Sequence, residues 1–131
     1  MKIGIPRERH NGEKRVAITP QVATRLMRIG FEVELECGAG LGASFSDESY
    51  EAVGVSIVDD VEALWRGADI ILKVRAPDEG DGSDVNELSL LKPDHLLISF
   101  IWPSQNDRLL QQLKDTRATV LAMDSVPRIS R

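Results

Sequence analysis

Four basic side chains follow two apolar runs of the sequence, and they are the residues best suited to bind an anion. Arg7 and Arg15 come after the amino-terminal run, and Lys73 and Arg75 lie at the end of a second run. If both runs are parallel strands, their carboxyl ends open on the same crevice. Arg15 with Lys73 would then suit a small carboxylate or a charged part of a cofactor. The alternative is that the arginines are solvated on loops, whereas a lysine inside an apolar strand requires a partner.

A glycine-rich segment, GAGLGA at residues 38–43, fits the G-x-G-x-x-(G/A) pattern of dinucleotide-binding turns. Such a turn should lead directly into a helix, with an acidic residue about 20 positions later to hold the ribose. Residues 44–46 instead intervene before the next predicted helix, and Asp59 and Asp60 are better explained as residues that open a helix. The sequence therefore favours a tight glycine turn over a phosphate site.

Trp102 follows another predicted strand, at a position where a catalytic residue could lie. An indole neither accepts nor delivers a proton at neutral pH, so we expect Trp102 to pack or to line a site. Ser104 is placed to cap the helix that follows. His10 and His95 lack metal-ligand spacing and no G-x-S-x-G motif occurs, so the sequence predicts neither a metal site nor a serine nucleophile.

The elements that must position these residues alternate between short apolar runs and segments of helical period. This alternation predicts an α/β fold, a doubly wound, mostly parallel sheet in three layers. The predicted strands cover residues 2–6, 31–37, 55–58, 69–74, 96–101 and 118–123. The predicted helices cover residues 20–29, 47–53, 61–65, 85–91 and 104–114. Residues 31–37 alternate apolar with acidic side chains, which indicates an edge strand.

Composition limits the class of protein. The chain has 131 residues, 42% of them hydrophobic, which is enough for one domain with a core, and no run approaches the ~20 apolar residues of a membrane span. A net charge of -5 argues against nucleic-acid binding. The lone Cys37 and the absence of a signal-peptide pattern fit a reducing, cytoplasmic setting. The acidic stretch from Asp78 to Glu87 is expected to be a solvated loop.

The carboxyl-terminal segment MDSVPRISR, residues 123–131, has the composition of the approach to a functional loop. It follows an apolar run and carries a proline and two arginines, Arg128 and Arg131. We therefore expect the chain to be a fragment whose terminal arginines act together with residues beyond position 131.

Five ordered motifs together resemble the amino-terminal part of one family, that of alanine dehydrogenase and the proton-translocating NAD(P) transhydrogenase alpha subunit. They are KIGIPRER at 2–9, RVAITP at 15–20, ILKV at 71–74, SFIWP at 99–103 and the segment 123–131. The resemblance implies that residues 1–131 are an incomplete amino-terminal domain of a two-domain protein. It also implies that the NAD-binding Rossmann domain, with the true glycine fingerprint, lies downstream.

The resemblance implies that the full protein transfers a hydride between NAD(H) and NADP(H), and that the full complex couples this transfer to proton translocation. Arg128, Ile129, Ser130 and Arg131 would form one wall of the NAD(H) site, with Arg128 toward the nicotinamide. No catalytic residue is assigned to this chain, which alone should show no turnover. NADP(H) would lie on a beta subunit that joins a membrane domain, and the full protein would be a homodimer, cytoplasmic and peripheral to the inner membrane.

Two other functions remain open at this point. In alanine dehydrogenases the equivalents of Arg15 and Lys73 hold the substrate carboxylate, but a catalytic histidine stands where this chain has Trp102. Amine oxidation needs proton transfer, whereas hydride transfer between two nicotinamides needs mainly placement, so Trp102 favours a transhydrogenase. The third possibility is a non-catalytic binding or assembly module. Whether the parent has a long alpha subunit or a separate soluble one, and its oligomeric state, stay open.

Overall fold

The computed structural model describes residues 1–9, 12–77, 85–101 and 107–123. Six strands form one sheet in the order β3-β2-β1-β4-β5-β6, and every pairing is parallel. The strands are β1 Lys2–Ile5, β2 Glu32–Glu36, β3 Ser56–Val58, β4 Ile70–Arg75, β5 Leu96–Phe100 and β6 Thr119–Ala122. The helices are α1 Pro20–Ile29, α2 Asp47–Glu51, α3 Val61–Gly67 and α4 Asp107–Thr116, with short 3-10 turns η1 Leu41–Ala43 and η2 Glu87–Leu90. The predicted α/β fold with a parallel sheet is confirmed.

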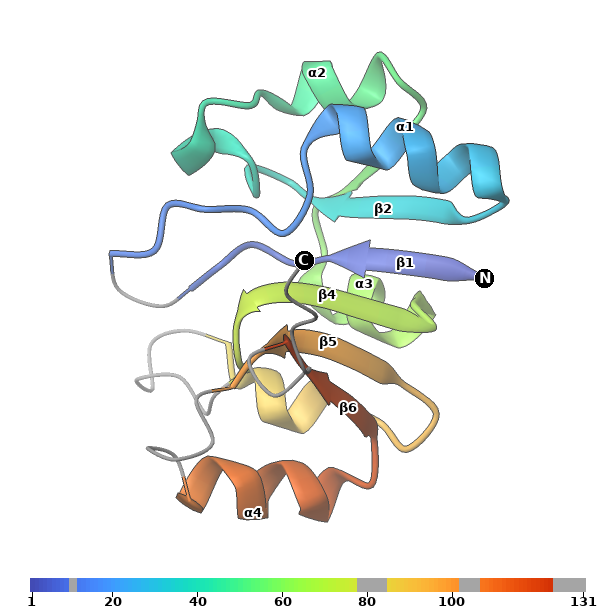
Figure 1. The fold of residues 1–131 in the computed structure, drawn as a ribbon. Helices are drawn as coiled ribbons and strands as arrows, with labels where there is room; N and C mark the ends of the chain where they lie inside the picture. The colour runs from blue at the N-terminus through green and yellow to red at the C-terminus, as the bar shows by residue number, and fades with distance from the viewer. Residues whose placement is uncertain (10–11, 78–84, 102–106, 124–131) are drawn as a thin grey trace, which may run out of the picture.

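The sheet is the middle of three layers (Figure 1). One apolar cluster lies between β1, β2 and the layer of α1 and α2, around Ile5, Ala23, Leu35 and Tyr50. The second cluster lies under α3, η2 and α4, and Trp65 and Leu97 are fully buried in it. The strand order reverses between β1 and β4, because β2 and β3 extend the sheet on one side of β1 and β4, β5 and β6 extend it on the other. In sheets of this kind, ligands bind at the carboxyl ends of the strands at that reversal.

Helix α1 shows how local sequence sets the boundaries of the elements. Thr19 accepts a hydrogen bond from the Val22 N–H at 3.2 Å, and Pro20 occupies the first helical position. Gly30 ends the helix with a φ of 118°, a conformation that a side chain would strain. The predicted cap, first residue and terminating glycine of this helix are all confirmed.

The prediction that residues 31–37 form an edge strand is wrong, because β2 lies between β1 and β3. Glu32 is exposed, but the other two acidic side chains of β2 are paired. Glu34 forms an ion pair with Lys2 at 3.5 Å, and Glu36 forms one with Arg9 at 2.6 Å. The alternation of apolar and acidic residues therefore reflects paired charges on an interior strand.

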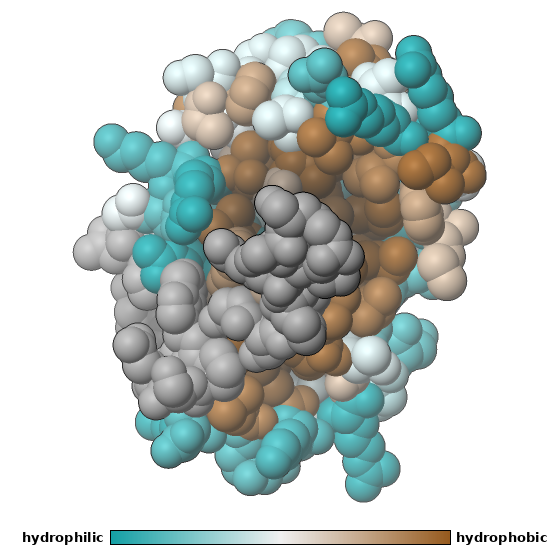
Figure 2. Space-filling model, viewed as in Figure 1, coloured by the Kyte–Doolittle hydropathy of each residue, from teal (hydrophilic) through white to brown (hydrophobic). Residues whose placement is uncertain are grey.

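Apolar side chains reach the surface on the sheet face that carries α1. Figure 2 shows apolar surface above, to the right of and below the residues drawn in grey. Phe100 at the end of β5, Leu121 in β6 and Met123 after it are 37%, 45% and 43% exposed. Within the described ranges, no helix is long and apolar enough to cross a membrane.

The glycine-rich segment is a tight turn, as predicted. Gly38 has a φ of 78°, and its N–H donates to the Asp47 carboxylate at 2.9 Å. A Cβ on Gly40 would lie 2.7 Å from Cε2 of Tyr50 and 2.8 Å from the Phe45 carbonyl oxygen. Tyr50 cannot retreat easily, because it is fully buried and its hydroxyl donates to the Ile18 carbonyl at 2.8 Å. These glycines therefore serve backbone conformation and close packing.

We predict that Gly40→Ala lowers the free energy of unfolding by about 1–3 kcal/mol, because the new methyl group overpacks against Tyr50 and a backbone carbonyl. Urea unfolding followed by circular dichroism measures the change. Gly67→Ala is the matched control, since its Cβ would meet nothing closer than Lys2 Nζ at 3.9 Å. Equal unfolding midpoints for Gly40→Ala and the parent chain would contradict the packing role.

Candidate functional site

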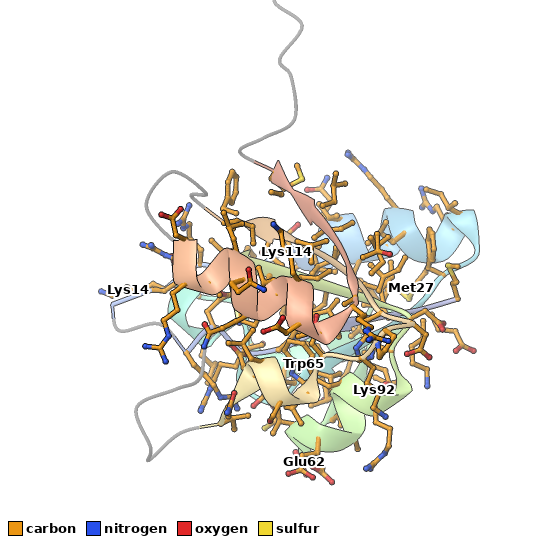
Figure 3. All side chains as sticks on the ribbon, turned by 90° about the horizontal axis from the view of Figure 1, so that it is seen from below. Lys14, Met27, Glu62, Trp65, Lys92 and Lys114 are labelled. Carbon is orange, nitrogen blue, oxygen red and sulfur yellow. The ribbon has the colours of Figure 1, made fainter. Side chains whose placement is uncertain are left out.

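The candidate site lies at the carboxyl ends of β1 and β4, where the strand order reverses. The arrows of β1, β2, β4 and β5 all point to the same side in Figure 1, so the segments that follow them gather there. Figure 3 shows Lys14, from the segment between β1 and α1, at this edge of the molecule, and Lys92 near the opposite edge. This edge contains all four basic residues that the sequence singled out.

Lys73 is buried in β4, with a side chain only 1% exposed. Its ammonium lies 3.0 Å from Glu87 Oε2 and 3.5 Å from Glu8 Oε1. Both carboxylates are as deeply buried as the lysine, at 3% and 2% exposure. A lysine in an apolar strand requires a partner of opposite charge, and Lys73 has two.

Glu8 joins the segment after β1 to the end of β4. Its Oε2 accepts the Val74 N–H and its Oε1 accepts the Arg75 N–H, both at 2.9 Å. Burial without such bonds would cost several kcal/mol for a charged group. The two strands that flank the reversal are therefore held together by a side chain in addition to their own ladder.

Arg15 and Arg75 converge on Glu13. Arg15 donates to Glu13 through Nε and Nη2, each at 2.9 Å, and Arg75 Nε donates at 2.8 Å. The hydrogen bond from the Arg15 side chain is the main cause of a Glu13 pKa well below its usual range. Glu13 in turn raises the pKa of Arg15, to which the charge of nearby Glu8 adds a smaller amount.

Glu36 ends β2, the position from which an acidic residue holds the ribose in many dinucleotide-binding sheets. Here both carboxylate oxygens accept from the Arg9 guanidinium, at 2.6 and 2.8 Å, and the Arg7 N–H donates at 3.0 Å. At the amino end of α1, the Thr19 side chain already occupies the Val22 N–H. This edge of the sheet thus has the position of a dinucleotide site, but its charged groups bind one another.

The structure brings together the predicted basic residues Lys73, Arg15 and Arg75, each on one of the chain's own carboxylates. Asp60 accepts the Glu62 N–H at 3.0 Å and so opens α3, as predicted. Several predicted residues lie outside the described ranges: His10, Trp102, Ser104 and the segment Arg128, Ile129, Ser130 and Arg131.

His95 is a structural residue. Its Nδ1 accepts the Lys92 N–H at 2.9 Å, so Nε2 carries the proton and donates to the Trp65 carbonyl at 2.7 Å. Figure 3 shows Trp65 in the interior near α3 and η2. Within the described ranges, no three His, Cys, Asp or Glu side chains are grouped so as to ligate a metal ion.

Sequence reasoning missed the four glutamates of the site, Glu8, Glu13, Glu36 and Glu87. The prediction of a solvated acidic loop is wrong for Glu87, which is 3% exposed and lies in η2 beside Lys73. A usable signal existed, because Glu87 stands next to the apolar residues Leu88, Leu90 and Leu91 while Lys73 lacked a partner. The rest of the acidic stretch, residues 78–84, lies outside the described ranges.

The strand order and the site at its reversal define a doubly wound α/β domain of the kind found in dehydrogenases. The family model described as "Alanine dehydrogenase/PNT, N-terminal domain" matches residues 4–131. The chain belongs to this family.

Similarity is high to the NAD(P) transhydrogenase subunit alpha of Cereibacter sphaeroides, 49% identity over all 131 residues and 24% of that protein. The alanine dehydrogenase of Halomonas elongata is 36% identical over 126 residues, 96% of this chain and 32% of that enzyme. The crystal structure of a transhydrogenase from Sinorhizobium meliloti matches with a TM-score of 0.88 and 31% identity, covering 99% of this chain and 37% of that one. The chain thus spans about a quarter to a third of the length of the curated relatives it matches.

We predict that the parent chain loses stability as the pH rises from about 4.5 to 7. Glu87→Gln should not show this loss. Burial raises the pKa of Glu87 from 4.5 to about 7. The folded chain therefore retains a proton that the unfolded chain releases, and folding becomes less favourable as the pH rises through this range. Across this range the free energy of unfolding of the variant, relative to that of the parent, should rise by about 3 kcal/mol.

Urea unfolding at a series of pH values measures this difference. Glu51→Gln, a substitution of an exposed residue in α2, is the matched control and should leave the pH dependence unchanged. Parallel curves for Glu87→Gln and the parent chain would show that Glu87 does not bind a proton in this range.

Proposed function

We propose that this chain is the amino-terminal domain of the NAD(H)-binding component of a transhydrogenase, which transfers a hydride between NAD(H) and NADP(H). In the full complex a membrane partner couples this transfer to proton movement, and a beta subunit binds NADP(H). The full protein is a homodimer, cytoplasmic and peripheral to the inner membrane. Residues beyond this domain supply the Rossmann fold that binds most of NAD(H).

The observation that carries the proposal is the 49% identity, over the whole chain, to a transhydrogenase alpha subunit, against 36% to an alanine dehydrogenase. The chemistry at position 102 supports the same branch. Tryptophan serves hydride transfer, which needs the two nicotinamides to be placed close together, but it cannot act as the acid or base of amine oxidation. In this proposal Arg128, Ile129, Ser130 and Arg131 form one wall of the NAD(H) site.

A second candidate, an alanine-dehydrogenase-like oxidoreductase, is favoured by one observation, the presence of Arg15 and Lys73. For that activity both cations would have to hold a substrate carboxylate. In the structure the Lys73 ammonium faces Glu8 and Glu87, and the Arg15 guanidinium binds Glu13 through two nitrogens. Substrate would have to displace these carboxylates, which makes the second candidate less favourable.

We predict that the chain can replace the matching part of the Cereibacter sphaeroides alpha subunit in a chimera that retains hydride transfer. Arg128→Ala in the chimera should raise the KM for NADH about tenfold or more, since a charge-assisted hydrogen bond is worth about 1.5–3 kcal/mol. Arg25→Ala, at an exposed position of α1, is the control. Steady-state transfer between NADH and an NADP analogue measures both effects.

Two results of the chimera experiment would contradict the proposal. One is oxidation of alanine with NAD as acceptor in the absence of transhydrogenation. The other is an unchanged KM in Arg128→Ala while the protein remains folded and active.

We also predict that the 131-residue chain alone binds NADH weakly or not at all, because Glu8 and Glu36 at this edge of the sheet already bind donors of the chain itself. A fluorescence titration of NADH with the purified chain measures this. Tight stoichiometric binding would show that this domain, rather than a downstream one, supplies the main NAD(H) surface.

A further inference from the structure

A groove lies between η2 and the last turns of α4, two elements that contact each other in the helix layer of α3 and α4 (Figure 1). Its volume is about 480 Å³, within the range of roughly 300–1,000 Å³ that is common for small-molecule sites. The segment of η2 contributes Asn86, Leu88, Ser89 and Leu91 to its lining. Helix α4 contributes Gln112, Asp115 and Thr116. None of these residues belongs to the site at the strand-order reversal.

The groove has an apolar floor and two walls that carry acceptor oxygens. Leu88 and Leu91 are 9% and 6% exposed and lie at its bottom, whereas the polar residues Asn86, Ser89 and Asp115 are exposed. Asn86 Oδ1 accepts the Ser89 N–H at 3.3 Å, and Ser89 Oγ donates to the Asn86 carbonyl at 2.7 Å. Each of these two side-chain oxygens therefore retains a lone pair for a further donor. The opposite wall presents the Asp115 carboxylate.

The negative charge of the groove is not compensated by any of the residues that line it. Asp115 accepts a hydrogen bond from Gln111 Nε2 at 3.2 Å, and within the described ranges it forms no ion pair. Lys114 lies on the other side of α4, because it is about 200° around the helix from both Gln112 and Thr116. The carbonyl end of α4 adds partial negative charge beside Asp115. This charge favours a cationic ligand.

We propose that the groove binds a short aliphatic diamine, with one ammonium at Asp115 and the other at Asn86 and Ser89. An ammonium group has three N–H donors and no acceptor, which matches walls made of acceptor oxygens. The alkyl chain between the two ammonium groups covers Leu88 and Leu91, as the stem of a lysine covers apolar surface. The proposal does not depend on the hydride transfer proposed above.

The probe is 1,4-diaminobutane, in which both amines are protonated at about pH 7. In ¹⁵N spectra of the 131-residue chain, we expect saturable shifts of the Ser89, Leu91 and Asp115 amide resonances. The dissociation constant should be on the order of 1 mM, since pairing with an exposed carboxylate contributes little free energy. Uncharged 1,4-butanediol, and sodium chloride at equal ionic strength, should not produce these shifts. Butylammonium, which has one ammonium, should bind about threefold more weakly or worse.

Three variants test the assignment of the two walls, with circular dichroism to confirm that each is folded. Asp115→Asn removes the charge with little change of shape and should weaken diamine binding about threefold or more. Asp94→Asn is the matched control, since it removes the same charge from an exposed position outside the groove and should leave binding unchanged. Ser89→Lys places the chain's own ammonium at the groove and should abolish saturable binding.

The proposal is overturned if the diamine produces no saturable shift of the groove resonances. It is also overturned if Asp115→Asn binds the diamine as tightly as Asp94→Asn does, or if Ser89→Lys binds it as tightly as the parent chain. Equal affinity for butylammonium would contradict it too. That result would show that the groove recognises a single ammonium, such as that of a lysine side chain.

Discussion

The need to neutralise a lysine inside a central strand governs the arrangement of the site. A charged group in β4 would be costly without partners, and Lys73 obtains them from two segments far away in the sequence, Glu8 after β1 and Glu87 in η2. Glu8 then takes the N–H groups that the irregularity of β4 leaves available. One buried charge thus fixes the path of the chain after β1, the end of β4 and the position of η2.

The cluster of Lys73, Glu8 and Glu87 contains more negative than positive charge. Two buried carboxylates face one ammonium, so one negative charge has no direct counterpart within the triad. Burial is the main cause of the raised Glu87 pKa, and the positive charges of Lys73 and Arg9 only partly oppose it, while Glu8 adds to it. The charge that the fold matches least well is therefore on Glu87, the first residue of η2.

The order of strands and α-helices was predictable from the sequence because most of these elements carry a local signal, whereas the 3-10 turn η1 was not predicted and η2 was predicted as part of a helix. The cap and proline of α1 and the apolar runs that became β1, β4 and β5 depend only on neighbouring residues. The position of a strand in the sheet depends on distant residues as well. The alternation of apolar and acidic residues in β2 was misread because Glu34 and Glu36 form ion pairs with cations from other segments. The glutamate partners of the site were missed for the same reason, since Glu8 and Lys73 are 65 positions apart in the sequence.

The ion pairs also explain how Arg15 and Lys73 can occur in a chain whose Trp102 does not suit amine oxidation. If these cations existed only to hold a substrate, a protein with another chemistry would not need them. In this structure Lys73 neutralises buried carboxylates and Arg15 helps to hold Glu13, which also binds Arg75. Both residues therefore have a structural role that does not depend on a substrate. It follows that the presence of Arg15 and Lys73 does not by itself indicate a bound substrate.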